Sequence, residues 1–181
     1  MGHIRVEPEV ILYLLFFLPN LSFYFGLTDQ LLSNLAKFLV SVCFIKRARL
    51  TLSPKGFLMG FLSCLAVFTP EVNLFLIPVV LLASFSEELV FRAVLQGKYG
   101  VLPSSLLFVL WHVPKLLSEP PYVLLSVFTL SLFWGLIYER TGDFSLVFSS
   151  HFFYDLFLSS GGSGPLWLSV VLVFVYVFRF W

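Results

Sequence analysis

The stretch that decides the class of fold is residues 74–96, which read LFLIPVVLLASFSEELVFRAVLQ. It is long and apolar enough for a transmembrane helix, which needs about 20 apolar residues. It nevertheless carries three charged side chains, those of Glu87, Glu88 and Arg92. A charge inside a bilayer costs a few kcal/mol, so ionisable residues there are rare and mark functional sites. These three residues are therefore the first candidates for a functional site.

The rest of the chain has the same apolar character. Of its 181 residues 59% are hydrophobic and 12% are charged, and the mean hydropathy is +0.98. Soluble domains carry about 25% charged residues. This composition predicts an integral membrane protein in contact with lipid. The net charge of +1 excludes a basic nucleic-acid-binding protein and an acidic disordered tail, so we expect no nucleic-acid partner.

Proline, glycine and charged residues divide the chain into eight apolar runs, at residues 10–26, 30–45, 55–69, 74–96, 102–117, 122–138, 144–159 and 165–180. They predict an all-α fold, a polytopic transmembrane bundle of about eight helices that forms one domain over residues 1–181. The first run resembles a signal peptide but lacks a cleavage site, so we expect a retained helix. The second run is the most polar, and an amphipathic helix along the interface is its alternative.

Lysine and arginine in short loops mark the cytoplasmic side of a membrane protein. With eight crossings, both termini lie on one side and share it with every loop lysine and arginine except Lys115. These residues are Arg5, Lys46, Arg47, Arg49, Lys55, Lys98, Arg140 and Arg179. We therefore expect a multi-pass protein of the cell membrane with both termini in the cytoplasm. If residues 30–45 do not cross, the N-terminus moves to the outside.

Two further apolar runs carry ionisable side chains, with His112 in one and His151 and Asp155 in the other. A helix rises about 1.5 Å per residue. Counted from the expected cytoplasmic ends of the helices, these side chains and the two glutamates lie at about 10–16 Å. The sequence thus predicts one polar layer on the cytoplasmic side of the midplane, contributed by three helices.

Spacing assigns these side chains to helix faces. Residues four apart share a face, as do Glu88 and Arg92, and His151 and Asp155. Glu87 is turned by about 100° from Glu88. We therefore expect Glu88 to pair with Arg92, which leaves Glu87 without a cation, facing the histidines as a general base. The alternative for the Glu88–Arg92 pair is a purely structural role in helix packing.

Three motifs resemble those of the CPBP family, which comprises CAAX proteases and bacteriocin-processing enzymes and is also called the Abi family. They are Glu87-Glu88-x-x-x-Arg92, Phe108-x-x-x-His112 and His151-x-x-x-Asp155, with WGLIYERTG at 134–142 similar to the family's Gly-rich segment. The resemblance covers residues 74–158, the expected catalytic core. It implies an intramembrane endopeptidase of eight helices with a cavity open to the cytoplasm.

The resemblance also implies roles for the motif residues and a class of substrate. Glu87 and His112 would activate the attacking water. His151 and Asp155 would stabilise the oxyanion, and Glu88 and Arg92 would support Glu87. The family includes the type II CAAX prenyl endopeptidases, which remove the last three residues of a prenylated C-terminus. The implied partner is therefore a membrane-associated or lipidated peptide or protein.

The last motif departs from these endopeptidases, which carry Asn where this chain has Asp155. Because an ionised Asp cannot donate a hydrogen bond, Asp155 is protonated, orients His151 or binds a metal. Glu87, His112, His151 and Asp155 are plausible zinc ligands, but the chain lacks an HExxH helix. We expect no metal cofactor, with zinc as the alternative.

Two other functions compete with proteolysis. A non-enzymatic immunity or scaffold protein would retain the motifs without turnover. A proton-coupled transporter would also place Glu and His side chains within the bilayer. Transporters are commonly built from two repeated halves, and the sequence shows no internal repeat.

Overall fold

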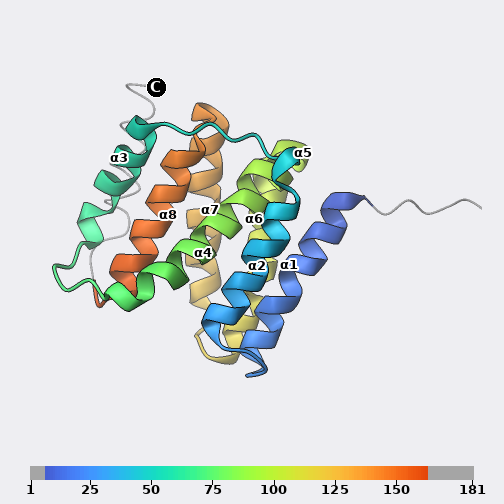
Figure 1. The fold of residues 1–181 in the computed structure, drawn as a ribbon, viewed down its shortest axis with the longest axis horizontal. Helices are drawn as coiled ribbons and strands as arrows, with labels where there is room; N and C mark the ends of the chain where they lie inside the picture. Colours follow the sequence, from blue (N-terminus) through green and yellow to red (C-terminus); the bar gives the residue numbers. More distant parts are fainter. Residues whose placement is uncertain (1–6, 163–181) are drawn as a thin grey trace, which may run out of the picture.

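The computed structural model describes residues 7–162 (Figure 1), so the predicted run at 165–180 lies outside the described residues. The described chain is helical, and apart from one isolated bridge between Thr51 and Asp143 it contains no extended pairing. The prediction of an all-α bundle is confirmed for this part of the chain. Its α-helices are α1 (Pro8–Tyr24), α2 (Gln30–Cys43), α3 (Pro54–Ser63), α4 (Ile77–Glu88), α5 (Gly97–Tyr99), α6 (Val101–His112), α7 (Tyr122–Thr141) and α8 (Phe144–Ser159).

Two helical stretches, Leu74–Tyr99 and Tyr122–Thr141, are long and apolar enough to cross a membrane. The first is continuous but not uniform, because a π-helix, Leu89–Gln96, connects α4 to α5. The shorter apolar helices include α1 and α2. The number of membrane crossings in the chain stays a prediction.

Local sequence explains where several helices begin. Asp29, Ser53 and Asp143 precede α2, α3 and α8, and each accepts a hydrogen bond from a backbone N–H in the first turn of its helix. Such caps satisfy donors that have no partner within the helix. After α7 the chain turns at Gly142, whose φ of 64° is a left-handed conformation that favours glycine.

The helices pack around α4 and the π-helix, which cross the centre of the bundle in Figure 1. α2 and α8 pack against α4, α3 lies along α8, and α6 lies along α7. One hydrophobic cluster around Leu89, Trp134 and Phe144 joins the π-helix to α7 and α8. A second, around Phe16 and Phe91, joins it to α1 and α6. The π-helix is therefore enclosed by its neighbours, and every residue in it is buried.

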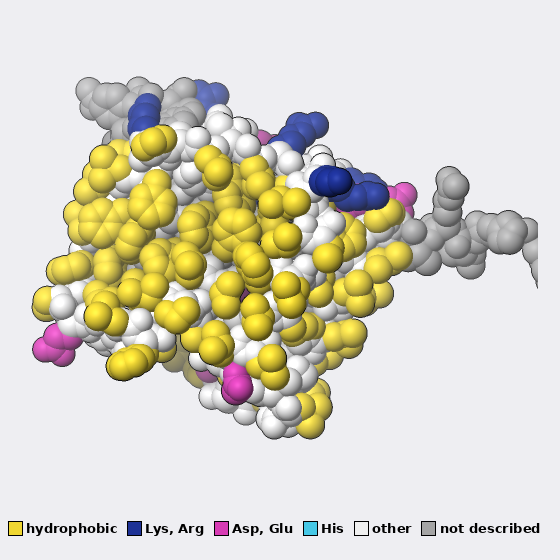
Figure 2. Space-filling view, in the orientation of Figure 1, with side chains coloured by type: hydrophobic (Ala, Val, Ile, Leu, Met, Phe, Trp, Pro, Cys, Tyr) yellow, Lys and Arg dark blue, Asp and Glu magenta, His cyan; other side chains and the backbone are white. Residues whose placement is uncertain are grey.

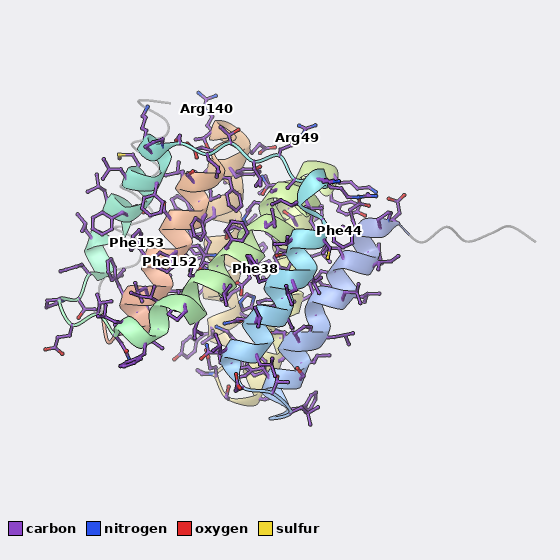
Figure 3. The ribbon with its side chains drawn as sticks, in the orientation of Figure 1. Phe38, Phe44, Arg49, Arg140, Phe152 and Phe153 are labelled. Carbon is purple, nitrogen blue, oxygen red and sulfur yellow. The ribbon has the colours of Figure 1, made fainter. Side chains whose placement is uncertain are left out.

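The outer surface is largely apolar, as Figure 2 shows for one face of the molecule. Exposed apolar side chains, mostly leucine, cover α1, α2, α3 and α6, which suits contact with lipid rather than water. Arginine and lysine side chains gather at one end of the bundle, where Figure 3 labels Arg49 and Arg140. We call this the basic end; it also carries Lys46, Arg47, Lys55 and Lys98.

The contact between α3 and α8 depends on Gly60. A Cβ at this position would overlap Ser149 Oγ and lie 2.7 Å from the Leu146 carbonyl oxygen. Overpacking of this kind typically costs about 1–3 kcal/mol. We therefore expect Gly60→Ala to lower the melting temperature of the detergent-solubilised protein. Gly97→Ala is the matched control, because a Cβ there meets no atom within 4 Å. Equal melting temperatures for the two variants would contradict the close α3–α8 contact.

Candidate functional site

The predicted ion pair is present at the end of α4. Glu88 Oε2 lies 3.2 Å from Arg92 Nε, and both side chains are 0% exposed. Arg92 also donates a hydrogen bond of 3.0 Å to Ser131 Oγ on α7. The pair spans the junction between α4 and the π-helix, a rare geometry that is frequent at functional sites. Arg92 thus links the central helix to α7 from a fully buried position.

His151 on α8 lies between two carboxylates. Its Nδ1 is 2.8 Å from Glu88 Oε1, and its Nε2 is 3.2 Å from Asp155 Oδ2. Trp134 stacks on the imidazole at 4.4 Å between ring centroids. A ring nitrogen donates to a carboxylate only when it carries a proton. The two contacts together fix the orientation of the ring, and carboxylate oxygens at both nitrogens favour the imidazolium form.

Glu87, the other glutamate of this motif, does not take part in the Glu88–Arg92 ion pair. Its Oε2 lies 3.8 Å from His151 Nε2, and its Oε1 lies 3.8 Å from Nζ of Lys37. The Lys37 side chain is buried, and its ammonium also lies 4.8 Å from the centre of the Trp111 ring. The expectation that Glu87 has no cationic neighbour was therefore wrong, because α2 packs against α4 and brings a lysine to it.

Lys37 was missed as a site residue, although the sequence held a signal for it. The polar residues of α2 are spaced like one face of a helix, and all are buried in the structure: Ser33, Asn34, Lys37 and Ser41. A polar stripe on an otherwise apolar helix in lipid faces the interior of the bundle. The stripe also argues that α2 packs within the bundle.

His112 is the last residue of α6. Its Nδ1 lies 2.8 Å from the Phe108 carbonyl oxygen. Because a carbonyl only accepts, Nδ1 carries the proton, and in the neutral imidazole Nε2 is an acceptor. No hydrogen bond joins His112 to Glu87 in the described structure. Both side chains line one cavity, so a water molecule held between them would have an acceptor on each side.

The cavity has a volume of about 510 Å³ and is enclosed by α1, α2, α4, α6, α7 and α8. Every predicted catalytic side chain lines it, as does Lys37, whereas the supporting pair Glu88 and Arg92 does not. Its solvent-exposed lining residues lie at the start of α2, after α6, at the start of α7 and at the end of α8. They are Gln30, Glu119, Ser126, Leu158 and Ser159. We call this end of the cavity the mouth.

The mouth lies at the opposite end of the bundle from the basic end, because α2 and α7 run from one to the other. The expected topology placed the basic loops and the cavity opening on one side of the membrane, and in this structure those two features are separate. The difference arises because α6 ends at His112 and α8 ends soon after Asp155. Their depth from the basic end agrees with the count, and because both helices end nearby, the same depth also places these side chains near the mouth.

The four side chains proposed as zinc ligands do not form a metal site in this arrangement. Within residues 7–162, no three histidine, cysteine, aspartate or glutamate side chains are grouped so that they could hold a metal ion. His151 presents both nitrogens to carboxylate oxygens, whereas a ligating nitrogen must face the metal. We therefore derive no chemical step through a metal.

Comparison with known proteins identifies one family and one bacterial relative. The family described as Type II CAAX prenyl endopeptidase Rce1-like matches residues 69–157. The relative is the uncharacterized protein YpbD of Bacillus subtilis, which is 35% identical over 75 residues. That match covers 41% of this chain and 39% of the relative. No solved structure matches. The family match contains all three motifs, and Lys37 lies outside it.

Proposed function

This chain belongs, through residues 69–157, to the CAAX protease family, and from this premise we propose that it is an intramembrane endopeptidase. The observation that supports the proposal is the position of Glu87, a buried carboxylate that lines a cavity together with His112 and His151. A carboxylate beside a histidine within a low-dielectric cavity is suited to remove a proton from water. The cavity is large enough for several residues of an extended peptide as well as that water.

In the proposed reaction, a water molecule lies between Glu87 and His112. Glu87 takes one proton as the water oxygen attacks the peptide carbonyl carbon. The same proton then passes to the leaving nitrogen as the C–N bond breaks. General-base catalysis of this kind typically contributes a factor of about 10² to 10⁴ in rate. The reaction needs no cofactor.

The remaining motif residues position this machinery. The buried Glu88–Arg92 pair holds His151 through its Nδ1, and Asp155 contacts Nε2 from one helical turn away. Of the three roles open to Asp155, orientation of His151 is the one that this geometry supports. An ionised Asp155 serves this role as a hydrogen-bond acceptor, which an Asn reproduces with its carbonyl oxygen.

We propose that the bundle crosses the membrane with its basic end in the cytoplasm, following the distribution of lysine and arginine. Lys115 is the only lysine or arginine that the described loops place at the mouth end. The mouth then opens away from the cytoplasm, and a membrane-associated peptide enters from that side. Access for a prenylated cytoplasmic tail would require the reverse orientation.

We expect Glu87→Gln to abolish cleavage and leave folding intact, because the amide keeps the shape of the side chain and loses its basicity. The assay uses detergent-solubilised protein with a farnesylated CAAX peptide and the same peptide unmodified, and mass spectrometry identifies the products. The rate should fall by about 10² to 10⁴. The exposed Glu139 on α7 provides the control Glu139→Gln.

Activity of Glu87→Gln within threefold of wild type would remove Glu87 from the mechanism. The same assay includes EDTA and o-phenanthroline, which should leave the rate unchanged. Loss of activity with chelators, restored by zinc, would replace the proposed mechanism with a metal-dependent one. Failure of the wild type to cleave either peptide, with folding intact, would favour a scaffold or immunity role.

The proposed topology is tested by cysteine labelling in intact cells, in a Cys43→Ser background because Cys43 is exposed. A membrane-impermeant maleimide should label Glu119→Cys at the mouth from outside. It should label Lys46→Cys at the basic end only after permeabilisation. The reverse pattern would turn the bundle over and open the cavity to the cytoplasm.

A further inference from the structure

Lys37 lines the reaction cavity but lies in α2, outside the matched family segment. Its side chain is 5% exposed, and its Nζ lies 3.8 Å from Glu87 Oε1, longer than a hydrogen bond. Among the described residues, no acceptor lies within hydrogen-bond distance of this nitrogen, and its other close neighbour is the Trp111 ring. Burial of an ammonium with only one loosely placed counter-ion is costly, and costly buried charges are frequent at functional sites.

The reaction proposed above needs a donor for the oxyanion that develops on the scissile carbonyl. His151 has a carboxylate at each ring nitrogen, and an ionised Asp155 cannot donate. The Nδ1 proton of His112 is held by the Phe108 carbonyl oxygen. Where the prenyl endopeptidases carry a second donor, Asn, this chain therefore has an acceptor that shares His151, and the oxyanion needs another donor.

We propose, on the basis of the proposed function, that Lys37 is a further catalytic residue whose ammonium stabilises the oxyanion. As the water oxygen bonds to the carbonyl carbon, its proton moves to Glu87 and the C=O π electrons move to the carbonyl oxygen. That oxygen, now negative, pairs with Lys37. Collapse restores the C=O bond and breaks the C–N bond, and the leaving nitrogen takes the proton from Glu87. The products are a carboxylic acid and an amine.

The charges of the cluster explain why this arrangement favours the transition state. Before reaction, the carboxylates of Glu87, Glu88 and Asp155 balance the cations of Arg92, His151 and Lys37. When Glu87 accepts a proton, it loses its charge and the oxyanion gains one. The counter-ion of Lys37 therefore changes from Glu87 to the oxyanion. In the resting enzyme Lys37 contacts Glu87 only loosely, at 3.8 Å. Its interaction with the oxyanion in the transition state is then the stronger of the two, as catalysis requires.

The test compares Lys37→Met and Lys37→Arg with wild type. Lys37→Met removes the ammonium and keeps much of the side-chain volume, so kcat should fall by about 10² to 10³, as when an oxyanion donor is lost. KM should change by less than about threefold, because the ground-state carbonyl makes little use of the ammonium. Lys37→Arg should recover part of the loss. Lys46→Met, which removes an exposed cation at the basic end, outside the cavity, is the control and should retain kcat.

A second readout separates a catalytic role from a structural one. A peptide phosphinate carries a tetrahedral, negatively charged group in place of the scissile amide, and transition-state analogues of this kind report transition-state contacts. Its affinity should fall in Lys37→Met by the same factor as kcat/KM. If Lys37→Met misfolds, Lys37→Arg replaces it in the test: both its kcat and its phosphinate affinity should lie below those of the wild type.

Wild-type kcat in Lys37→Met would overturn the role of Lys37 and leave the proposed protease intact. A fall in kcat with unchanged phosphinate affinity would also overturn it, because Lys37 would then act only on Glu87. A wild type that neither cleaves peptide nor binds the phosphinate would overturn both this inference and the proposed function.

Discussion

Glu88 holds two partners at once, Arg92 at 3.2 Å and His151 at 2.8 Å, and its own side chain is fully buried. Through these contacts one carboxylate joins the central helix to α8, and the bond from Arg92 to Ser131 extends the link to α7. Removing one member of a buried ion pair typically costs about 3–5 kcal/mol, because the other charge is left uncompensated. The position of His151, and with it one wall of the cavity, depends on this pair.

The same arrangement gives the site its chemistry. Because Glu88 is engaged by Arg92 and His151, Glu87 on the adjacent helix face is the carboxylate that lines the cavity. Lys37 from α2 and His112 from α6 complete the wall around it. The bundle therefore contains a polar interior whose charges balance within it, while its exterior stays apolar. A reaction that moves one proton within this interior changes the partners of the charges and not their sum.

Sequence periodicity and charge placed most of this structure correctly. The apolar runs between residues 10 and 159 correspond to the observed helices, and the spacing of Glu88 and Arg92 was enough to predict their pairing. Lys37 was not found because its partner comes from another helix, and helix-to-helix contacts depend on packing rather than spacing. The end of the bundle at which the cavity opens could not be predicted for a related reason. Distance along a helix fixes the depth of a side chain but not which end of the bundle the neighbouring helices leave open.

The arrangement of the site depends most directly on the buried Glu88–Arg92 pair, and a double-mutant cycle of Glu88→Gln and Arg92→Met measures the strength of that pair. The free energy of unfolding is determined in detergent for the wild type, both single variants and the double variant. The amide introduced by Glu88→Gln keeps an oxygen that can accept a hydrogen bond from His151. Each single variant should lose about 3–5 kcal/mol, and the double variant should be more stable than either, since neither charge is then stranded. Losses that simply add in the double variant would show that the two side chains do not act as a pair, and would contradict the account.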